Sequence, residues 1–141
     1  MFNRILVAID GSKMSEKALK SAIDIAKERY SKIEVIHVEK KLAITEEMPY
    51  TTVDNIYSQQ RKEAEDLLNQ AVSLAENEGI KIETQCVIGE PYIQIIKRAE
   101  ERNCQLIVIG SRGLGNIKGL MLGSVSQKVS QLAHCPVLII K

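Results

Sequence analysis

Residues 106–129 read LIVIGSRGLGNIKGLMLGSVSQKV, and this stretch indicates both the fold and a binding site. An apolar, strand-like segment at 106–109 runs into five of the chain's eight glycines and then into residues with helical spacing. Glycine lets the backbone approach a ligand closely, and the free N–H groups at a helix N-terminus point at an anion. A strand, a glycine loop and a helix start in this order favour a site for phosphate.

Strand-like and helix-like segments alternate outward from this stretch to both ends of the chain. The expected strands are 5–9, 33–38, 81–88, 105–109 and 136–140. The expected helices are 15–29, 53–78, 91–99 and 124–134. Such alternation is typical of βαβ units. The sequence therefore predicts a single α/β domain over residues 1–141, with a five-stranded parallel sheet.

Local signals mark the ends of several elements. Ser12 and Ser15 are alternative N-caps of the first helix. Gly79 is expected to end the second helix, and Pro91 to begin the third. Segment 40–50 has no clean period and contains a proline, so we expect a surface loop that acts as a lid or is partly disordered.

Two of the expected strands have the character of sheet edges. Strand 81–88 alternates apolar and polar residues, as an exposed strand does. Strand 136–140 is apolar on both faces, and an edge strand of this kind aggregates unless something covers it. We therefore expect 136–140 to pair with the same strand of a second copy in a homodimer.

Composition excludes several classes of partner. The chain has 141 residues, 45% of them hydrophobic and 26% charged, and a net charge of +1. It has no basic stripe and few aromatic residues, so we expect no nucleic-acid partner. The apolar run 5–9 is short and is followed by Asp10, which fits neither a signal peptide nor a membrane span. We expect a cytoplasmic protein without a membrane partner.

The cysteines and histidines form no metal-binding pattern. Cys86, Cys104 and Cys135 make no CxxC pair and lie in or beside apolar runs. We therefore expect buried free thiols in preference to a metal or redox role. His37 and His134 have no ligand partner at metal-site spacing, and we expect both to be structural.

The glycine loop matches a known family motif. Gly110, Gly113 and Gly123, the last followed by Ser124, have the spacing Gly-x2-Gly-x9-Gly-(Ser/Thr). With this motif the chain resembles the ATP-binding branch of the universal stress protein family. Further agreement lies in 5–12, 89–91, 122–126 and 135–140.

The resemblance implies a doubly wound sheet of order 3-2-1-4-5, with helices on both faces, that binds ATP at the carboxyl ends of the first and fourth strands. This place agrees with a physical rule, because a crevice opens where the strand order reverses. Asp10 and Gly110 would then face each other across the crevice. Magnesium would enter with the nucleotide, held largely by phosphate oxygens and water, with Asp10 as a candidate protein ligand.

Carried over by position, the resemblance assigns residues to both ends of the nucleotide. The triphosphate would meet Gly110, Arg112, Gly113, Gly123, Ser124, Val125 and Ser126. The adenosine end would meet Ala8, Asp10, Val38 and Ile109. The glycines would bring the backbone close to phosphate, the amides of 124–126 and the serine hydroxyls would hold phosphate oxygens, and Arg112 would add a cation.

These signals also have ordinary structural explanations. Glycine-rich loops before helices often bind nothing. Asp10 also fits a turn residue that ends a strand and caps the next helix, and Arg112 fits a solvated charge. The apolar residues of the loop could form a docking patch, but we expect them to pack onto the protein. They are Leu114, Ile117, Leu120, Met121 and Leu122.

The leading hypothesis, from the resemblance, is a stress-response protein whose ATP occupancy alters its dimer surface for an unidentified protein partner. One alternative is a slow ATP hydrolase or a phosphoryl- or adenylyl-transfer enzyme on the same site, and another is a nucleotide-free dimeric scaffold. The chain has no Gly-x4-Gly-Lys-(Ser/Thr) loop and no second carboxylate near Asp10 in sequence. The sequence therefore favours holding ATP over cleaving it, with no catalytic residues and a slow ATPase activity at most.

Overall fold

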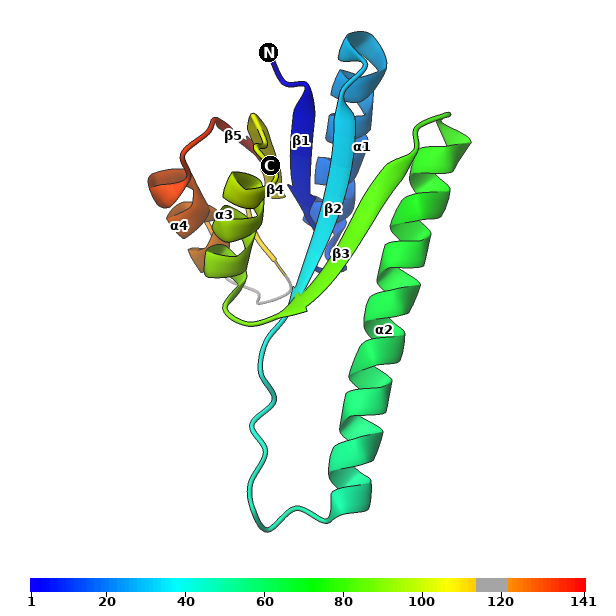
Figure 1. Cartoon of the computed structure of the whole chain (residues 1–141), viewed down its shortest axis with the longest axis vertical. Helices are drawn as coiled ribbons and strands as arrows, with labels where there is room; N and C mark the ends of the chain where they lie inside the picture. The colour runs from blue at the N-terminus through cyan, green and yellow to red at the C-terminus, as the bar shows by residue number, and fades with distance from the viewer. Residues whose placement is uncertain (114–121) are drawn as a thin grey trace.

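The computed structural model describes residues 1–113 and 122–141, which form a five-stranded sheet with helices around it (Figure 1). All strand pairs are parallel, and the strand order is β3-β2-β1-β4-β5. The strands are β1 (Arg4–Ala8), β2 (Lys32–Glu39), β3 (Ile82–Ile88), β4 (Leu106–Gly110) and β5 (Val137–Ile140). The expected fold class and strand order are confirmed, and so are the edge positions of β3 and β5.

Helices cover both faces of the sheet. They are α1 (Lys13–Arg29), α2 (Tyr50–Asn77), α3 (Pro91–Glu101) and α4 (Ser124–Leu132). Figure 1 shows α1 and α2 on one side of the sheet and α3 and α4 on the other, with the first turns of α2 extending past the end at which the strands finish. In the described part of the chain, no helix has the length and apolar character that crossing a bilayer requires.

The central strand β1 is apolar on both faces. Ile5, Val7 and Ile9 pack into a core cluster with α1 and α2. Leu6 and Ala8 pack into a second cluster with α3 and α4. Successive side chains of a strand point to opposite faces, so a strand with a helix layer on each side must be apolar throughout. The uninterrupted apolar run near the N-terminus therefore predicts a central position in the sheet.

Capping residues explain where the helices begin and end. Ser12 is the N-cap of α1, and its hydroxyl accepts a hydrogen bond from the Ser15 N–H at 3.1 Å, which decides between the two candidates. Gly79 follows the end of α2 with a φ of +74°, in the left-handed region that glycine tolerates. Pro91 occupies the start of α3, as expected.

The expectation of three buried thiols is wrong for Cys86, which is exposed on the edge strand β3, and holds only in part for Cys135, which is half-buried. Cys104 is buried, as expected. Desolvation raises the pKa of the Cys104 thiol to about 11 and also raises the pKa of the other two thiols. Protonated thiols are poor metal ligands and poor nucleophiles.

A buried ion cluster joins α3 to the sheet. Glu34 on β2 is 1% exposed, and its carboxylate accepts hydrogen bonds from Arg98 Nε at 2.5 Å and Arg102 Nε at 3.0 Å. Arg102 also donates to Glu83 on β3 at 2.6 Å. A buried carboxylate requires partners of this kind, because transferring an unpaired carboxylate from water into the protein interior costs several kcal/mol.

Candidate functional site

The carboxyl ends of β1 and β4 meet near the centre of the sheet. β1 pairs with β2 on one side and with β4 on the other, so the strand order reverses between β1 and β4. Asp10 follows β1, and Gly110 ends β4. In an open parallel sheet a crevice forms at such a switch point, because the connections leave toward opposite faces.

A cavity of about 860 Å³, which we call the switch-point cavity, lies at this place. Small-molecule sites typically measure about 300–1,000 Å³. Its walls come from the ends of β1, β2 and β4, the glycine loop, the start of α4 and the segment 40–43. All eleven residues expected at a nucleotide site line it. They are Ala8, Asp10, Val38, Ile109, Gly110, Arg112, Gly113, Gly123, Ser124, Val125 and Ser126.

The motif glycines lie where a side chain would collide with neighbouring atoms. A Cβ at Gly110 would lie 2.8 Å from the Met14 Cβ on α1. A Cβ at Gly113 would overlap the Asp10 carboxylate, and one at Gly123 would lie 3.3 Å from a carbonyl oxygen of the loop. Real Cβ atoms rarely come so close to their neighbours, so the motif spacing reflects close approaches among the loop, α1 and the end of β1.

Helix α4 begins at the wall of the switch-point cavity, with Gly123 as its N-cap. The first amides of a helix, here those of 124–126, have no carbonyl within the helix to bond. Gly123 has no side chain that could cap them. Amides in this position favour an anion, with the helix dipole behind them. The Ser124 side chain is exposed beside these amides and adds a hydroxyl donor.

The hydroxyl of Ser126 has partners other than the phosphate oxygens we expected. Ser126 is 2% exposed, and its Oγ donates toward the Ser111 carbonyl at 2.9 Å and the Gly123 carbonyl at 3.0 Å. The same Ser111 carbonyl accepts a hydrogen bond from the Gly123 N–H at 2.7 Å. The hydroxyl therefore ties the glycine loop to α4, and the contribution of Ser126 to an anion site is left to its amide.

Asp10 takes part in the turn and also lines the cavity. Its Oδ1 accepts a hydrogen bond from the Ser12 N–H at 2.9 Å, which forms an Asx turn after β1. Its Oδ2 lies against Gly113. The two interpretations of Asp10 are therefore compatible, since the turn holds the carboxylate beside the glycine loop. Arg112 is half-buried and lines the same cavity, so it is not a fully solvated charge.

Sequence reasoning missed a polar wall that comes from β2, the loop after it and α2. The wall contains His37, Glu39, Lys40, Lys41 and Gln60. The run of charged residues directly after the second expected strand could have indicated Glu39, Lys40 and Lys41. Gln60 lies on a separate helix, and only the folded chain brings it to the cavity. The other lining residues are Ile9, Ser15, Ile36, Leu42, Ala43, Pro91 and Ile95.

Part of the glycine loop lies outside the described residues. Four apolar residues that we expected to pack onto the protein fall in this part, namely Leu114, Ile117, Leu120 and Met121. The fifth, Leu122, is described and is half-buried.

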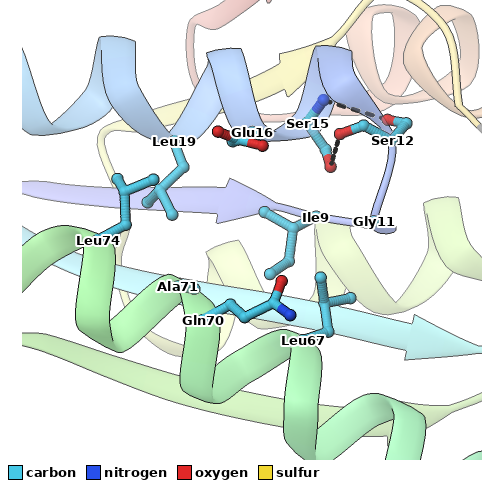
Figure 2. Close-up of a pocket in the computed structure, with 10 residues that line it drawn as sticks. All are labelled: Ile9, Gly11, Ser12, Ser15, Glu16, Leu19, Leu67, Gln70, Ala71 and Leu74. Atoms are coloured by element: carbon cyan, nitrogen blue, oxygen red, sulfur yellow. Dashed lines mark hydrogen bonds between the residues drawn. The ribbon is translucent and has the colours of Figure 1, made fainter.

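A second cavity of about 180 Å³ lies between α1 and α2 (Figure 2). Leu19, Leu67 and Leu74 point into it, and the hydrogen bonds between Ser12 and Ser15 close one end. None of the eleven expected site residues lines this cavity. Its lining mixes aliphatic side chains with the polar Ser12, Ser15, Glu16 and Gln70, and its small size is that of a packing gap between two helices on the same face of the sheet.

The switch-point cavity is lined both by apolar side chains and by backbone amides. Ala8, Val38 and Ile109 supply aliphatic surface, and the start of α4 supplies the amides. Across residues 1–113 and 122–141, no three His, Cys, Asp or Glu side chains are grouped so that they could hold a metal ion. The arrangement suits a ligand with a flat apolar part and an anionic part.

Comparisons with known proteins point to one family. The sequence model described as "Universal stress protein family" matches residues 1–141. Universal stress protein YxiE of Bacillus subtilis is 43% identical over 148 aligned positions, which cover 100% of both chains. A universal stress protein of Archaeoglobus fulgidus, solved in complex with dAMP, is 28% identical with a TM-score of 0.71 over 100% of both chains. Another universal stress protein, solved in complex with cAMP, is 27% identical with a TM-score of 0.76 over 99% of this chain and 97% of its own.

Proposed function

The chain belongs to the universal stress protein family, and from this premise we propose that it binds ATP in the switch-point cavity and acts as a cytoplasmic homodimer of single-domain chains. ATP occupancy alters the dimer surface that meets a protein partner, and the protein regulates a stress response in this way. The observation that carries the proposal is the convergence of all eleven motif-derived residues on one cavity.

The chemistry of this cavity supports an adenine nucleotide. Two relatives were solved with dAMP and with cAMP, and both of these ligands combine an adenine ring with a phosphate. The aliphatic surface of Ala8, Val38 and Ile109 matches a purine ring, and the amides at the start of α4 match phosphate oxygens.

The preference for ATP over a monophosphate rests on the motif and on charge. The spacing from Gly110 to Ser124 is that of the ATP-binding branch of the family. Arg112, Lys40 and Lys41 line the cavity, and cations of this kind offset the charge of a triphosphate. Magnesium fits the same site only as a companion of the nucleotide, with phosphate oxygens and water as its main ligands and Asp10 as the candidate protein ligand.

Holding ATP is favoured over cleaving it. The carboxylates that line the described part of the cavity are Asp10 and Glu39. Asp10 accepts a hydrogen bond from the Ser12 amide, and Glu39 accepts one from Gln60. The chain also lacks the Gly-x4-Gly-Lys-(Ser/Thr) loop that would place a lysine on the β- and γ-phosphates, so we expect ATP turnover to be slow at most.

The homodimer rests on the edge strand β5. β5 pairs with β4 on one side and has no further strand beyond it in the described sheet. Leu138 on this strand is 36% exposed. An apolar edge strand presents unpaired backbone groups to another chain, and a second copy would cover them.

Gly113→Val tests the proposed site. A valine side chain would overlap the Asp10 carboxylate and would keep the loop backbone away from phosphate. We expect ATP affinity, measured by titration calorimetry, to fall by about a hundredfold or more, which corresponds to roughly 3 kcal/mol. Gly79→Asn is the matched control, because asparagine tolerates the left-handed backbone of Gly79 and this position is not among those lining the cavity.

A folded Gly113→Val protein that binds ATP as tightly as the parent would show that the glycine loop does not hold the phosphates. Mass spectrometry of the nucleotide that co-purifies with the unmodified protein identifies the ligand without assuming it. We expect ATP, and a preparation that carried only a nucleotide without an adenine ring would contradict the proposed ligand class.

A further inference from the structure

A buried histidine lies between two hydrogen-bond acceptors beside the switch-point cavity. His37 is 7% exposed. Its Nδ1 lies 2.9 Å from the Ile9 carbonyl oxygen, and its Nε2 lies 2.8 Å from Glu39 Oε1. A carbonyl oxygen can only accept a hydrogen bond, so Nδ1 must carry a proton. The contact at Nε2 also requires a proton, whether the imidazole or the carboxyl group carries it.

The contacts of His37 continue into α2 and the loop after β2. Glu39 Oε2 accepts a hydrogen bond from Gln60 Nε2 at 3.1 Å. The same amide nitrogen lies 3.3 Å from the Lys40 carbonyl oxygen. We call His37, Glu39 and Gln60 the His37 network. It links four segments of the chain, namely the end of β1, the end of β2, the start of the loop 40–49 and α2.

Both ends of the His37 network lie at the cavity wall. Ile9 directly precedes Asp10, so the hydrogen bond from His37 Nδ1 to the Ile9 carbonyl restrains the backbone next to Asp10. The Gln60 contact holds Lys40, which lines the same cavity together with Lys41. Loops are the most mobile parts of a fold, so a wall made of loop residues needs such ties to keep a fixed shape.

We infer that His37 is a positioning residue for the nucleotide site, which holds the Asp10 turn and the wall 40–43 in their binding geometry through its contacts with the Ile9 carbonyl and the Glu39 carboxylate. The inference rests on the proposed nucleotide function for its effect on affinity. It goes beyond that function by assigning a role to a histidine that the glycine motif does not include.

Three substitutions at one position separate the two contacts of the imidazole. His37→Leu removes both hydrogen-bond donors and replaces the imidazole with an apolar side chain of similar size. His37→Gln places an amide donor near the position of Nε2, and His37→Asn places one near Nδ1. Gln70→Ala on α2 serves as the control for a glutamine outside the network, because Gln70 lines the smaller cavity between α1 and α2.

Two measurements test the inference on these variants. The first is ATP affinity by calorimetry. The second is the rate of trypsin cleavage after Lys40 and Lys41 without nucleotide, which reports how firmly the wall is held. Melting temperatures identify any variant that has lost its fold, and the His37→Gln and His37→Asn proteins keep the test valid if His37→Leu is one of them.

The expected result is that His37→Leu weakens ATP binding about tenfold, the order for loss of a hydrogen bond to a charged group, and speeds cleavage. His37→Gln should restore slow cleavage and an ATP affinity close to that of the parent, because its amide donates to Glu39 in place of Nε2. His37→Asn should cleave as fast as His37→Leu, and Gln70→Ala should resemble the parent. Equal cleavage rates in the parent, His37→Gln and His37→Asn would overturn the inference, as would a folded His37→Leu protein that binds ATP as tightly as the parent. If the parent itself fails to bind ATP, the proposed function fails, and the cleavage series still decides whether His37 holds the wall.

Discussion

Asp10 shows how one residue can satisfy the requirements of both the fold and a site. Its Oδ1 accepts a hydrogen bond from the Ser12 amide, and Ser12 in turn caps α1. Its Oδ2 faces Gly113 at the glycine loop. The Asx turn thus determines where the carboxylate lies, and the absence of a side chain at Gly113 leaves the space that it occupies.

Asp10→Asn separates the two roles, because asparagine makes the same turn but carries no charge. We expect the melting temperature to stay within about 2 °C of the parent, the shift of a change well under 1 kcal/mol. We expect the affinity for adenosine, which has no phosphate, to fall about fivefold, since a hydrogen bond to a charged acceptor is stronger than one to a neutral acceptor. Calorimetry with adenosine measures the second effect. A lower melting temperature with unchanged adenosine affinity would assign Asp10 to the turn alone.

At the residue scale, the sequence predicted contacts that are local or tied to a motif. The spacing from Gly110 to Gly123 indicated the glycine loop, and the structure brings these residues to one cavity. His37 was expected to be structural, and its place beside the cavity was missed. Its contact with Ile9 spans 28 positions, and the contact from Glu39 to Gln60 spans 21, so no local pattern reveals them.

At the scale of the element, α3 is held to the sheet by charge as well as by apolar packing. Ile95 and Ala99 of this helix are buried in the core. Beside them, Arg98 and Arg102 reach Glu34 on β2. The Arg102 side chain is bonded to Glu34 and Glu83, and these contacts raise the pKa of its guanidinium above the ordinary value. Glu34 is the one member of the cluster that is fully buried.

The asymmetric burial of this cluster predicts an asymmetric response to substitution. Arg98→Met with Arg102→Met leaves the Glu34 charge buried without a cation, and we expect a loss of about 3–5 kcal/mol in the free energy of unfolding. Glu34→Met leaves two arginines that can turn toward water, so we expect a loss of less than about 1.5 kcal/mol. Urea unfolding measures both values. A loss for Glu34→Met as large as that for the arginine pair would contradict this account.

The elements themselves were predictable where a strand or helix has one apolar pattern and a recognisable cap. Strand β1 and helix α1 meet both conditions through the apolar run 5–9 and the N-cap Ser12. Glu34 interrupts such a pattern in β2, and its buried position depends on arginines far along the chain. The exposure of Cys86 was missed because an alternating strand does not show whether a helix covers each face.

At the scale of the whole molecule, the strand order places the site and the dimer edge. Periodicity predicted a parallel five-stranded sheet, and the order β3-β2-β1-β4-β5 came from the family resemblance. Alternating helices and strands are compatible with several orders, because tertiary packing decides which strands become neighbours. Once the order is known, the reversal between β1 and β4 locates the crevice, and β5 becomes the open edge.

Leu138→Glu tests whether β5 forms the dimer. A charge on an edge strand opposes pairing with another chain, so we expect the variant to be monomeric at concentrations where the parent is dimeric. Leu132→Glu is the matched control, because Leu132 is exposed on α4 and lies outside the edge strand. Light scattering after gel filtration measures the mass. A monomeric parent, or a variant that stays dimeric, would rule out an interface through β5.

The central claim is that the switch-point cavity holds a nucleotide by its phosphates, and a crystal structure of the unmodified protein with saturating ATP tests it most directly. We predict adenosine density against Ala8 and Val38, and phosphate density within hydrogen-bond distance of the amides of 124–126. Ordered ATP at any other place on the molecule, or a switch-point cavity that remains empty at saturating ATP, would contradict the account.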